Sequence, residues 1–559
     1  MASYVIGGLS RLTVRVSKLL AEEGDEVTVL SNPGEEELRS LLDSRVRVLP
    51  LQGDRETVMR AAGLDEAACL LALGEDDLQN LRTLVAGGAA APHVPLVLRA
   101  FDPVLAEQVT RHGRLRRAFS VSALAAPAFI VAASGGEVAE TMRLGSEEVP
   151  VARLPIAQGS TVAGLTVREV EQRTGCAVLA EALGDGRWRP VMDPARTLAE
   201  GESIAVGGPL MDVLGLAQLA AAPLPARRRD REAARERRRE LRRRMPRPLV
   251  VSGVLLVGVL VTMVAVFGVV LHTGPVHAFY DAVLTAFGNG PVDATKPEHG
   301  GLKVFAVICM IATGILVAAV FSYATAAVTS ERLERREARR IAKLRGHAVV
   351  AGLDNVGYRL EQVLHRMGVP TVAVDREPDA RFSAALAART PLVQGDPRLR
   401  ENLERAGMDR AGVLFAVTED ELLNVQVCLQ ARALNPTVRT VARVFDEDFA
   451  GDASRTLGID ATLSASMAAA TAFVSAATDE QPVRPFQMGG LELAARRLDV
   501  TRQMARTEIE AWAAQGIQPL AYRPPGGAAQ RASTLPEVVE PGSHLILAGP
   551  EEAVRRTSA

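Results

Sequence analysis

Two long segments without a charged residue constrain this chain most strongly. They cover residues 249–271 and 304–328. As α-helices they would measure roughly 34 and 37 Å, whereas the hydrocarbon core of a bilayer is about 30 Å thick. Helices inside soluble domains rarely run so far without a charge, so the sequence predicts two membrane-spanning helices.

The charges beside these segments predict their orientation. Residues 227–247 hold twelve arginines against four acids, residues 331–345 hold seven basic residues against three acids, and the connection 272–303 holds only two lysines. Because Lys and Arg accumulate on the cytoplasmic side, both basic flanks, both termini and the large polar parts are expected in the cytoplasm. The arginine-rich run lacks interleaved aromatic residues, which favours contact with membrane lipid over nucleic acid.

The chain contains a duplication on either side of the apolar segments. Short motifs recur at an offset near 344 residues: Gln52, Gly53 and Asp54 recur as Gln394, Gly395 and Asp396, Asn80 as Asn424, and Arg99 and Phe101 as Arg443 and Phe445. One long offset indicates two copies of one domain rather than a short solenoid repeat.

Each copy begins with short apolar runs separated by helical patterns. In the second copy these runs lie at 347–351, 371–374, 391–393, 413–417 and 438–444. Strands that are apolar throughout and alternate with helices predict a parallel sheet covered on both faces, a Rossmann-like α/β fold. Near the end of the two copies, residues 201–209 resemble residues 542–550 in sequence. This similarity predicts a small α+β lobe at the end of each copy.

The predicted organisation is a series of seven segments. It comprises a Rossmann-like lobe at 1–145 and a small lobe at 148–210, a basic linker helix at 211–247, a membrane domain at 248–330, a linker helix at 331–345, a second Rossmann-like lobe at 346–478 and a second small lobe at 486–552. The membrane domain is expected to hold helices at 249–271 and 303–328, with a short helix and loop at 276–291.

The second copy carries a degenerate nucleotide-binding fingerprint. Gly352 and Gly357 match the first and third glycines of G-x-G-x-x-G, and Asp354 replaces the second. That second glycine allows a diphosphate to approach the helix N-terminus, and a carboxylate there would repel it. Asp375 ends the second strand, 23 residues after Gly352, where an acid suits the hydroxyls of a ribose.

The sequence therefore predicts a ligand site in the second copy. The expected ligand is NAD or another adenine nucleotide, with or without a diphosphate, or else a divalent cation. The candidate binding residues are Gly352, Asp354, Asn355, Gly357, Asp375, Arg376, Asp396 and Thr418. For Asp396 and its counterpart Asp54, a turn-forming role and a ligand role stay equally open.

The fingerprint is reduced further in the first copy. One glycine aligns, Leu12 falls at the third glycine position, and Ser31 replaces the acid. These changes favour a structural role for the first copy.

No catalytic arrangement is evident in the sequence. The eight histidines do not cluster with acids, and the cysteines lie far apart without a Cys-x-x-Cys pair. This pattern argues against an enzyme and against a metal site of the zinc type.

The connection between the apolar segments predicts a re-entrant element. Residues 276–286 suit a half-membrane helix that leads into Phe287, Gly288 and Asn289. Non-helical backbone at membrane depth is tolerated where it lines water or protein, and glycines let carbonyl groups face a narrow ion path. A plain surface turn at 288–290 is the alternative interpretation.

With these features the chain resembles potassium channels that have two membrane helices per subunit and are regulated by RCK (regulator of potassium conductance) domains. The resemblance covers most of the chain and rests on Tyr280, Asp281 and Ala282, on residues 301–305, and on Gly395, Asp396 and Asn424. It implies that potassium or another cation binds in a selectivity filter formed by Thr285, Ala286, Phe287, Gly288, Asn289 and Gly290. It also implies that Gly314 is a gating hinge, although a glycine that packs against a neighbouring helix fits equally well.

The filter departs from the T-V-G-Y-G pattern of that family. Ala286 stands where the threonine would form the innermost ion site, and Asn289 stands where the tyrosine would pack behind the filter. The Gly-Asn pair is also similar to the Castor and Pollux cation channels, which carry tandem RCK units. The resemblance therefore implies a cation channel without implying strict selectivity for potassium.

The resemblance further implies a ligand-gated channel in the plasma (inner) membrane of a prokaryote. Four subunits would surround one pore, because two helices cannot enclose it, and eight RCK domains would form a cytoplasmic ring. The alternative is a non-conducting, membrane-anchored nucleotide sensor or a regulatory subunit of a cation transporter.

Overall fold

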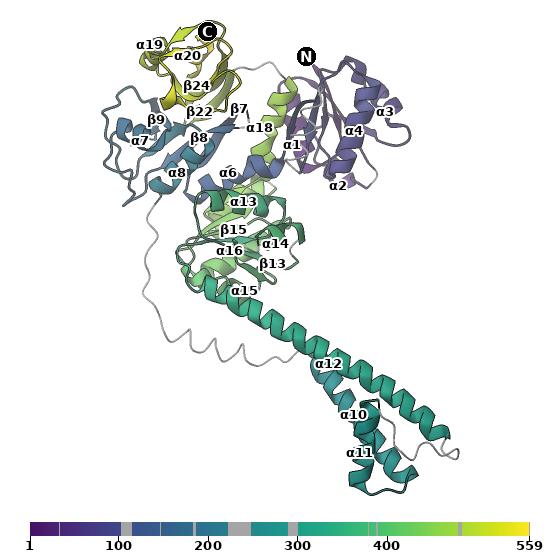
Figure 1. The fold of residues 1–559 in the computed structure, drawn as a ribbon. Helices are drawn as coiled ribbons and strands as arrows, with labels where there is room; N and C mark the ends of the chain where they lie inside the picture. The colour runs from purple at the N-terminus through teal and green to yellow at the C-terminus, as the bar shows by residue number, and fades with distance from the viewer. Residues whose placement is uncertain are drawn as a thin grey trace. The chain divides into compact units, whose positions relative to one another are not determined.

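The chain forms two compact units in a computed structural model (Figure 1). Unit 1 comprises Met1–Pro225 and Lys343–Ala559, and unit 2 comprises Ala226–Ala342. The structure describes residues 1–32, 34–101, 115–145, 147–182, 186–221, 247–288, 300–377, 380–386, 389–445, 447–478 and 483–557.

The first repeat opens with a doubly wound α/β lobe. Its six strands are all parallel and lie in the order β3-β2-β1-β4-β5-β6. The strands are β1 (Ser3–Gly7), β2 (Glu26–Ser31), β3 (Arg47–Pro50), β4 (Cys69–Ala72), β5 (Leu96–Arg99) and β6 (Leu115–Phe119). The helices α1 (Arg11–Glu22), α3 (Arg55–Ala61) and α4 (Asp77–Ala90) connect them. The two strands at the centre, β1 and β4, are buried almost throughout, as expected for a parallel sheet with helices on both faces.

The second repeat has the same topology, which confirms the predicted fold class. Its strands lie in the order β14-β13-β12-β15-β16-β17 and are also parallel. They are β12 (Ala348–Ala351), β13 (Thr371–Asp375), β14 (Leu392–Gln394), β15 (Val413–Ala416), β16 (Arg439–Arg443) and β17 (Ala461–Leu463). Helix α13 (Asn355–Arg366) follows β12, and α16 (Glu421–Leu434) follows β15.

Each repeat ends in a small lobe with a five-stranded antiparallel sheet. The first consists of β7 (Glu137–Leu144), β8 (Glu147–Pro155), β9 (Ala177–Ala182), β10 (Trp188–Pro190) and β11 (Ser203–Gly207), with α7 (Val167–Thr174) and α8 (Leu210–Ala220). The second consists of β18 (Val483–Met488), β19 (Leu491–Asp499), β21 (Gln518–Arg523), β22 (Gln530–Arg531) and β24 (His544–Pro550).

The first small lobe begins earlier than the predicted residue 148. Strand β7 pairs with β8 along its length, from Glu137 opposite Arg153 to Leu144 opposite Glu147. The sequence placed this strand in the preceding lobe, because a hairpin edge strand with many charges lacks the apolar run of a buried strand.

The two small lobes share one hydrophobic core. Buried residues of β7, β8, β9 and β11 pack with those of β18, β19, β21 and β24, for example Val151 and Leu179 with Leu493 and Ile546. An ion pair between Arg531 and Asp212, 2.5 Å from Nη2 to Oδ1, lies across the same interface.

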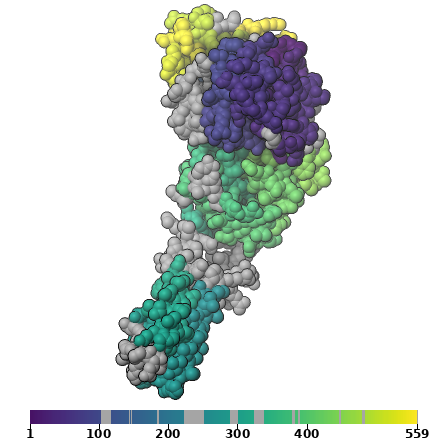
Figure 2. Space-filling view, turned by 90° about the vertical axis from the view of Figure 1, so that its right-hand side faces the viewer, coloured from purple at the N-terminus to yellow at the C-terminus, as the bar shows by residue number. Residues whose placement is uncertain are grey.

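The two repeats also exchange helices. Helix α6 (Val121–Ala133), which follows the first sheet, packs on α13 of the second repeat, and α18 (Ala465–Thr478), which follows the second sheet, packs on α1 of the first (Figure 1). Neither helix contains a charged residue. Each helix is therefore expected to pack against apolar side chains on more than one of its sides. In the space-filling view of Figure 2 the purple and blue atoms of the first repeat lie directly against the green atoms of the second.

Unit 2 is a hairpin of two long helices with a short helix between them. Helix α10 (Arg247–Val270) packs against α12 (Gly300–Ile341), and α11 (Pro275–Ala286) packs against both. Their shared core contains Met263, Phe267, Ala278, Ala282 and Ala306, all buried.

The outer surface of this hairpin is apolar. Val254, Val261 and Val269 on α10, and Ile308 and Ile315 on α12, are all more than half exposed. Within the described residues, the stretches Val251–Val270 and Gly300–Ser322 are long and apolar enough to cross a membrane. The second continues without a break through the residues predicted as a separate linker helix, since α12 ends only at Ile341.

The helix exchange predicts that one aromatic contact stabilises both repeats. Phe473 of α18 is fully buried, and its ring lies 5.1 Å from the ring of Phe119 in the first repeat. Phe473→Ala should lower the free energy of unfolding of unit 1 by about 3–5 kcal/mol, because it removes the ring and leaves a cavity. Chemical denaturation followed by circular dichroism measures this change.

A matched control is Leu78→Ala on α4, where the side chain is 56% exposed. This substitution should change the free energy of unfolding by less than about 0.5 kcal/mol. Equal effects of the two substitutions would contradict the helix exchange as a stabilising contact.

Candidate functional site

The turn between β12 and α13 depends on its two glycines. Gly352 has a φ of +99°, and a Cβ added there would lie 2.8 Å from the Thr418 nitrogen. A Cβ added to Gly357 would lie 1.9 Å from the carbonyl oxygen of Gly352. These positions therefore need glycine so that helix, turn and neighbouring strand approach each other closely.

Asp354, at the second glycine position, caps α13. Its Oδ1 accepts hydrogen bonds from the Val356 and Gly357 nitrogens, at 2.9 and 3.0 Å, and its Oδ2 forms an ion pair with Arg443 Nη1 at 2.8 Å. Burial raises the pKa of Asp354, and the charge of Arg443 opposes that shift. The amides that would hold a phosphate thus already hold a carboxylate of the chain itself.

Asp375 and Arg376 lie where the sequence predicted them, at the carboxyl end of β13. Asp375 Oδ2 accepts from the Leu353 nitrogen at 2.6 Å and Oδ1 from the Glu377 nitrogen at 2.8 Å. Asp375 therefore fixes the glycine turn, and its carboxylate retains lone pairs for further donors. Arg376 is exposed and lies 3.8 Å from the Glu377 carboxylate.

Asp396 has the geometry of a turn residue. Its carboxylate accepts from the Arg398 nitrogen at 2.9 Å and pairs with the Arg398 guanidinium at 2.6 Å. The side-chain hydrogen bond from Arg398 is the main cause that lowers the pKa of Asp396. The sequence left both a turn-forming role and a ligand role open for Asp396, and these contacts support the turn-forming role.

Asn424 holds two strand ends together beside Thr418. Its Oδ1 accepts from the nitrogen and from the hydroxyl of Thr418, at 2.9 and 2.7 Å, and its Nδ2 donates to the carbonyl oxygens of Thr418 and Arg443, at 3.0 and 2.9 Å. Thr418 thus lies at the edge of the site with its hydroxyl engaged. Asn355 is the first residue of α13.

The first repeat corrects the predicted alignment. Gly8, with a φ of +89°, is the counterpart of Gly352, so Ser10 corresponds to Asp354 and Thr13 to Gly357. Thr13, rather than Leu12, stands at the third glycine position, and its hydroxyl donates to the Gly8 carbonyl at 2.8 Å. The sequence alignment was one residue out because Gly7 and Gly8 are adjacent.

Side chains of α1 in the first repeat reach the edge of the second sheet. The Arg11 guanidinium lies 3.5 Å from the ring centre of Phe445, and its Nη1 lies 3.4 Å from Glu421 Oε1. Arg15 donates to the Phe445 carbonyl at 3.3 Å, and Arg443 lies 4.9 Å from the same ring. The sequence showed Arg443 and Phe445 only as repeated residues, and it did not predict that α1 would contribute to this edge.

The predicted filter residues begin in the last turn of the short helix of unit 2 and continue beyond it. Thr285 and Ala286 form the last turn of α11, and the Thr285 hydroxyl donates to the Asp281 carbonyl at 2.8 Å. Phe287 is exposed and Gly288 has a φ of +90°. Asn289 and Gly290 lie outside the described residues.

Gly314 lies within the unbroken helix α12. A Cβ added to it would meet no atom within 4 Å. Gly314 is therefore not a close packing contact among the residues that the structure describes.

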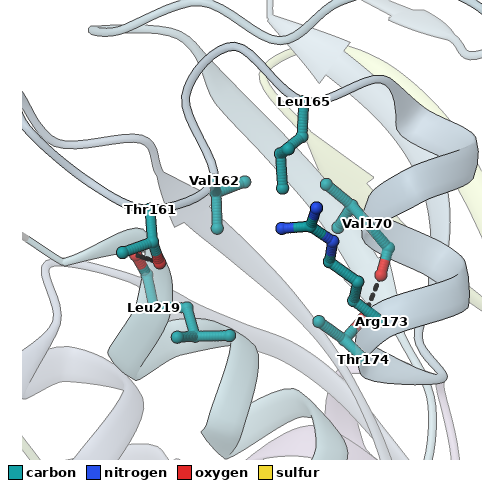
Figure 3. A pocket seen from close by; sticks show the side chains of 7 residues that line it. All are labelled: Thr161, Val162, Leu165, Val170, Arg173, Thr174 and Leu219. Carbon is teal, nitrogen blue, oxygen red and sulfur yellow. Dashed lines mark hydrogen bonds between the residues drawn. The ribbon is translucent and has the colours of Figure 1, made fainter.

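A small pocket lies in the first small lobe, away from every predicted site residue. It has a volume of about 220 Å³ and lies between α7 and α8 (Figure 3). In Figure 3 the Arg173 side chain reaches among the apolar side chains. The lining residues are Thr161, Val162, Leu165, Val170, Arg173, Thr174 and Leu219. Across the part of the chain that the structure describes, no three His, Cys, Asp or Glu side chains gather to hold a metal ion.

The two Rossmann-like lobes match one family model, the TrkA-N domain, over residues 4–119 and 348–465. The chain thus contains two TrkA-N (RCK) domains, each with an antiparallel small lobe, and two long apolar helices lie between them in sequence. The crystal structure of the GsuK RCK domain is similar over 99% of this chain and 93% of that chain, with a TM-score of 0.50 and 16% identity. The GsuK channel is similar over 99% and 78%, with the same score and identity, which shows a shared fold.

Several of the curated relatives, all distant, are named as potassium channels or as proteins of a potassium transport system. Probable potassium channel protein 2 of Methanocaldococcus jannaschii is 24% identical over 36% of this chain and 60% of its own length, and potassium channel protein 1 of that organism is 27% identical over 30% and 51%. The glutathione-regulated potassium-efflux system protein KefC of Salmonella arizonae is 28% identical over 33% and 28%. The chain spans between 32% and 60% of the length of the first three relatives.

The Asp354–Arg443 ion pair predicts a large effect of one substitution. Asp354→Ala leaves the Arg443 guanidinium, whose side chain is 13% exposed, without its carboxylate. Removal of one partner of a buried pair costs about 3–5 kcal/mol of unfolding free energy. Urea denaturation monitored by circular dichroism tests this value.

The matched control is Arg398→Ala, which breaks the more exposed pair with Asp396. An exposed pair contributes about 0–1 kcal/mol. If both substitutions cost the same, Asp354 and Arg443 are not a buried pair in solution.

Proposed function

We propose that this protein is a ligand-gated cation channel whose opening depends on its RCK domains. The observation that carries the proposal is the hairpin of unit 2, in which α11 packs between two long helices and ends at a glycine turn. A short helix that ends in a non-helical turn between two apolar helices suits a pore loop. The similarity to potassium channel proteins supports the same function.

The proposed membrane arrangement follows from the apolar surface of the hairpin. Exposed valines and isoleucines along α10 and α12 favour contact with lipid acyl chains. The basic residues on either side favour a cytoplasmic location for both termini and all RCK domains, in the plasma (inner) membrane of a prokaryote.

The proposed assembly is a homotetramer. Two helices and one loop cannot enclose an ion path, so several hairpins are needed around one axis. Four chains supply four pore loops and eight RCK domains, which form the gating ring. Thr285, Ala286, Phe287, Gly288, Asn289 and Gly290 would line the filter for potassium or another cation. Gly314 offers a position at which α12 bends, since none of the described residues would lie within 4 Å of a Cβ added there.

The second repeat is proposed to bind a ligand such as NAD, another adenine nucleotide or a divalent cation. Asp375 retains acceptor capacity, while Arg376 and Asn355 lie beside the glycine turn formed by Gly352 and Gly357. Asp354 occupies the phosphate position of that turn, which favours a ligand that is held through its sugar or base. Such a ligand opens or closes the pore only if it binds one state of the ring more tightly.

A regulatory subunit of a cation transporter is the second candidate. The similarity to KefC, a protein of a potassium-efflux system, favours it, and Ala286 and Asn289 depart from the filter of potassium channels.

Ion flux through proteoliposomes separates the two candidates. The purified chain should release potassium from loaded vesicles, and the rate should change with added NAD, adenosine nucleotides or divalent cations. Gly288→Val should abolish the flux, because a β-branched residue is strongly disfavoured at a φ of +90°. Gly300→Ala, at a helical position with open space around it, should leave the flux unchanged.

If a folded, membrane-inserted assembly shows no flux under any of these conditions, the proposal of a channel is wrong and the proposal of a regulatory subunit is favoured. Equal flux from the Gly288 and Gly300 variants would show that the turn after α11 does not line the ion path.

A further inference from the structure

The pocket of the first small lobe is built from segments that differ in the second small lobe. Its walls are α7, α8 and the connection 156–166 between β8 and α7 (Figure 3). In the second lobe the connection between β19 and α19 (Arg506–Glu510) covers only residues 500–505. The helix after β24, α20 (Glu551–Arg556), has 6 residues, whereas its counterpart α8 has 11. The walls of the pocket therefore belong to the first repeat rather than to the fold that the two repeats share.

Hydrogen bonds fix the longer connection on the last turn of α8. The Thr161 nitrogen donates to the Leu219 carbonyl at 3.3 Å, and the Ala157 nitrogen donates to the Ala220 carbonyl at 2.9 Å. These backbone groups would lose their partners if the connection moved across the pocket toward α7, and an unpaired backbone group inside a protein is costly. The backbone therefore keeps the space between the walls open.

The lining of the pocket is mostly apolar, and its hydroxyl groups are already engaged. Val162 and Val170 are buried at the pocket. The Thr161 hydroxyl donates to the Leu219 carbonyl at 3.3 Å. The Thr174 hydroxyl donates to the Val170 carbonyl at 2.7 Å. Water in a cavity needs two to four polar partners, and few remain here, so the transfer of an apolar group from bulk water into the pocket is favourable.

One charged side chain lines the same pocket. Arg173 extends from the last turn of α7 toward Val162 and Leu165, as Figure 3 shows. Its guanidinium forms no hydrogen bond or ion pair with another residue of the described part of the chain. The Glu169 carboxylate, one turn earlier, accepts from the Thr166 nitrogen and hydroxyl at 2.8 and 2.9 Å, and Arg173 acts on it only through its charge. The donors of Arg173 are therefore available to a bound group.

The size and the lining of the pocket define a class of ligand. Its volume of about 220 Å³ corresponds to about seven water molecules of about 30 Å³ each, which suits a hydrocarbon group of about five carbons. A guanidinium binds a carboxylate through two parallel hydrogen bonds. A ligand that uses both features has a short hydrocarbon part and one carboxylate.

We propose that the first small lobe binds a short-chain monocarboxylic acid, with its hydrocarbon part between α7 and α8 and its carboxylate on Arg173. Leu219, which lines the pocket, lies in the last turn of α8, and the chain continues from there toward the first membrane helix, α10. The site thus directly precedes, in sequence, the connection to the membrane domain. An effect of the acid on gating rests on the proposed channel function, whereas the binding itself does not.

Equilibrium dialysis of the full chain in lipid nanodiscs tests the site, with radiolabelled hexanoate as the probe and empty nanodiscs as the background. The wild type should bind one hexanoate per chain. Acetate has the same carboxylate without the chain, and hexanamide has the same chain without the charge. Each should displace the label at least tenfold less effectively than unlabelled hexanoate. Equal displacement by either compound overturns the proposal, because the site then recognises only an anion or only an apolar group.

Substitutions separate a bound carboxylate from a merely structural arginine. Arg173→Gln should weaken hexanoate binding by roughly tenfold or more, the equivalent of one charge-assisted hydrogen bond. The matched control is Arg168→Gln, which removes the same charge from an exposed position of α7 that does not line the pocket and should leave the affinity unchanged. Equal affinities of the two variants overturn the proposal, because Arg173 then only covers apolar side chains with its stem.

A variant that fills the pocket gives an independent test. Leu219 is 44% exposed, so Leu219→Trp places a larger side chain in the pocket without a change in the core and should abolish hexanoate binding. Millimolar hexanoate should raise the melting temperature of the wild type and of Arg168→Gln but not that of Leu219→Trp. The same shift in all three proteins contradicts the site, as does an absence of binding by the folded wild type at millimolar hexanoate.

These measurements keep the site apart from the proposed channel. Neither dialysis nor thermal unfolding needs an ion current. A chain that binds hexanoate without ion flux would overturn only the proposed function, and a conducting chain without hexanoate binding would overturn only this site.

Discussion

The burial of two uncharged helices, α6 and α18, is the constraint on which unit 1 depends. Each helix leaves the sheet that precedes it and covers a helix of the other repeat, α13 or α1. Neither repeat can therefore bury its apolar surface alone, and the shared core of the small lobes adds a second link. The two repeats consequently form one compact unit that is held together by shared packing.

This packing places the edges of the two parallel sheets close to each other, at the ends of β5 and β16. Arg11 and Arg15 from the first repeat contact Phe445 of the second, and Arg99 and Arg443 are near enough for their charges to interact. The edges are nevertheless unequal, since Asp354 forms an ion pair with Arg443 while its counterpart Ser10 supplies no charge beside Arg99.

The sequence predicted the fold well because its strongest signals are local. The uncharged segments predicted the helices α10 and α12. The recurrent motifs, together with the fully apolar strands, predicted the two parallel sheets. The sequence did not predict which lobe α6 and α18 would cover, because an apolar helix specifies burial without specifying a partner. From the sequence, strand β7 was assigned to the preceding lobe for a similar reason. Its charged residues give no apolar strand pattern, and its pairing with β8 is seen only in the structure. At the candidate site, the charge of Asp354 predicts that a diphosphate is repelled. The sequence does not predict the ion pair of Asp354 with Arg443, because the two residues lie 89 positions apart and meet only in the tertiary fold.

The central claim is that several hairpins of unit 2 surround an ion path controlled by paired RCK domains. Single-particle electron microscopy of the full chain in lipid nanodiscs tests it most directly. The account predicts four copies around one axis, with the C-terminal ends of the four α11 helices directed toward a central opening and eight RCK domains on one side of the membrane. A particle with two copies, or with hairpins that face only lipid and leave no central path, would contradict it.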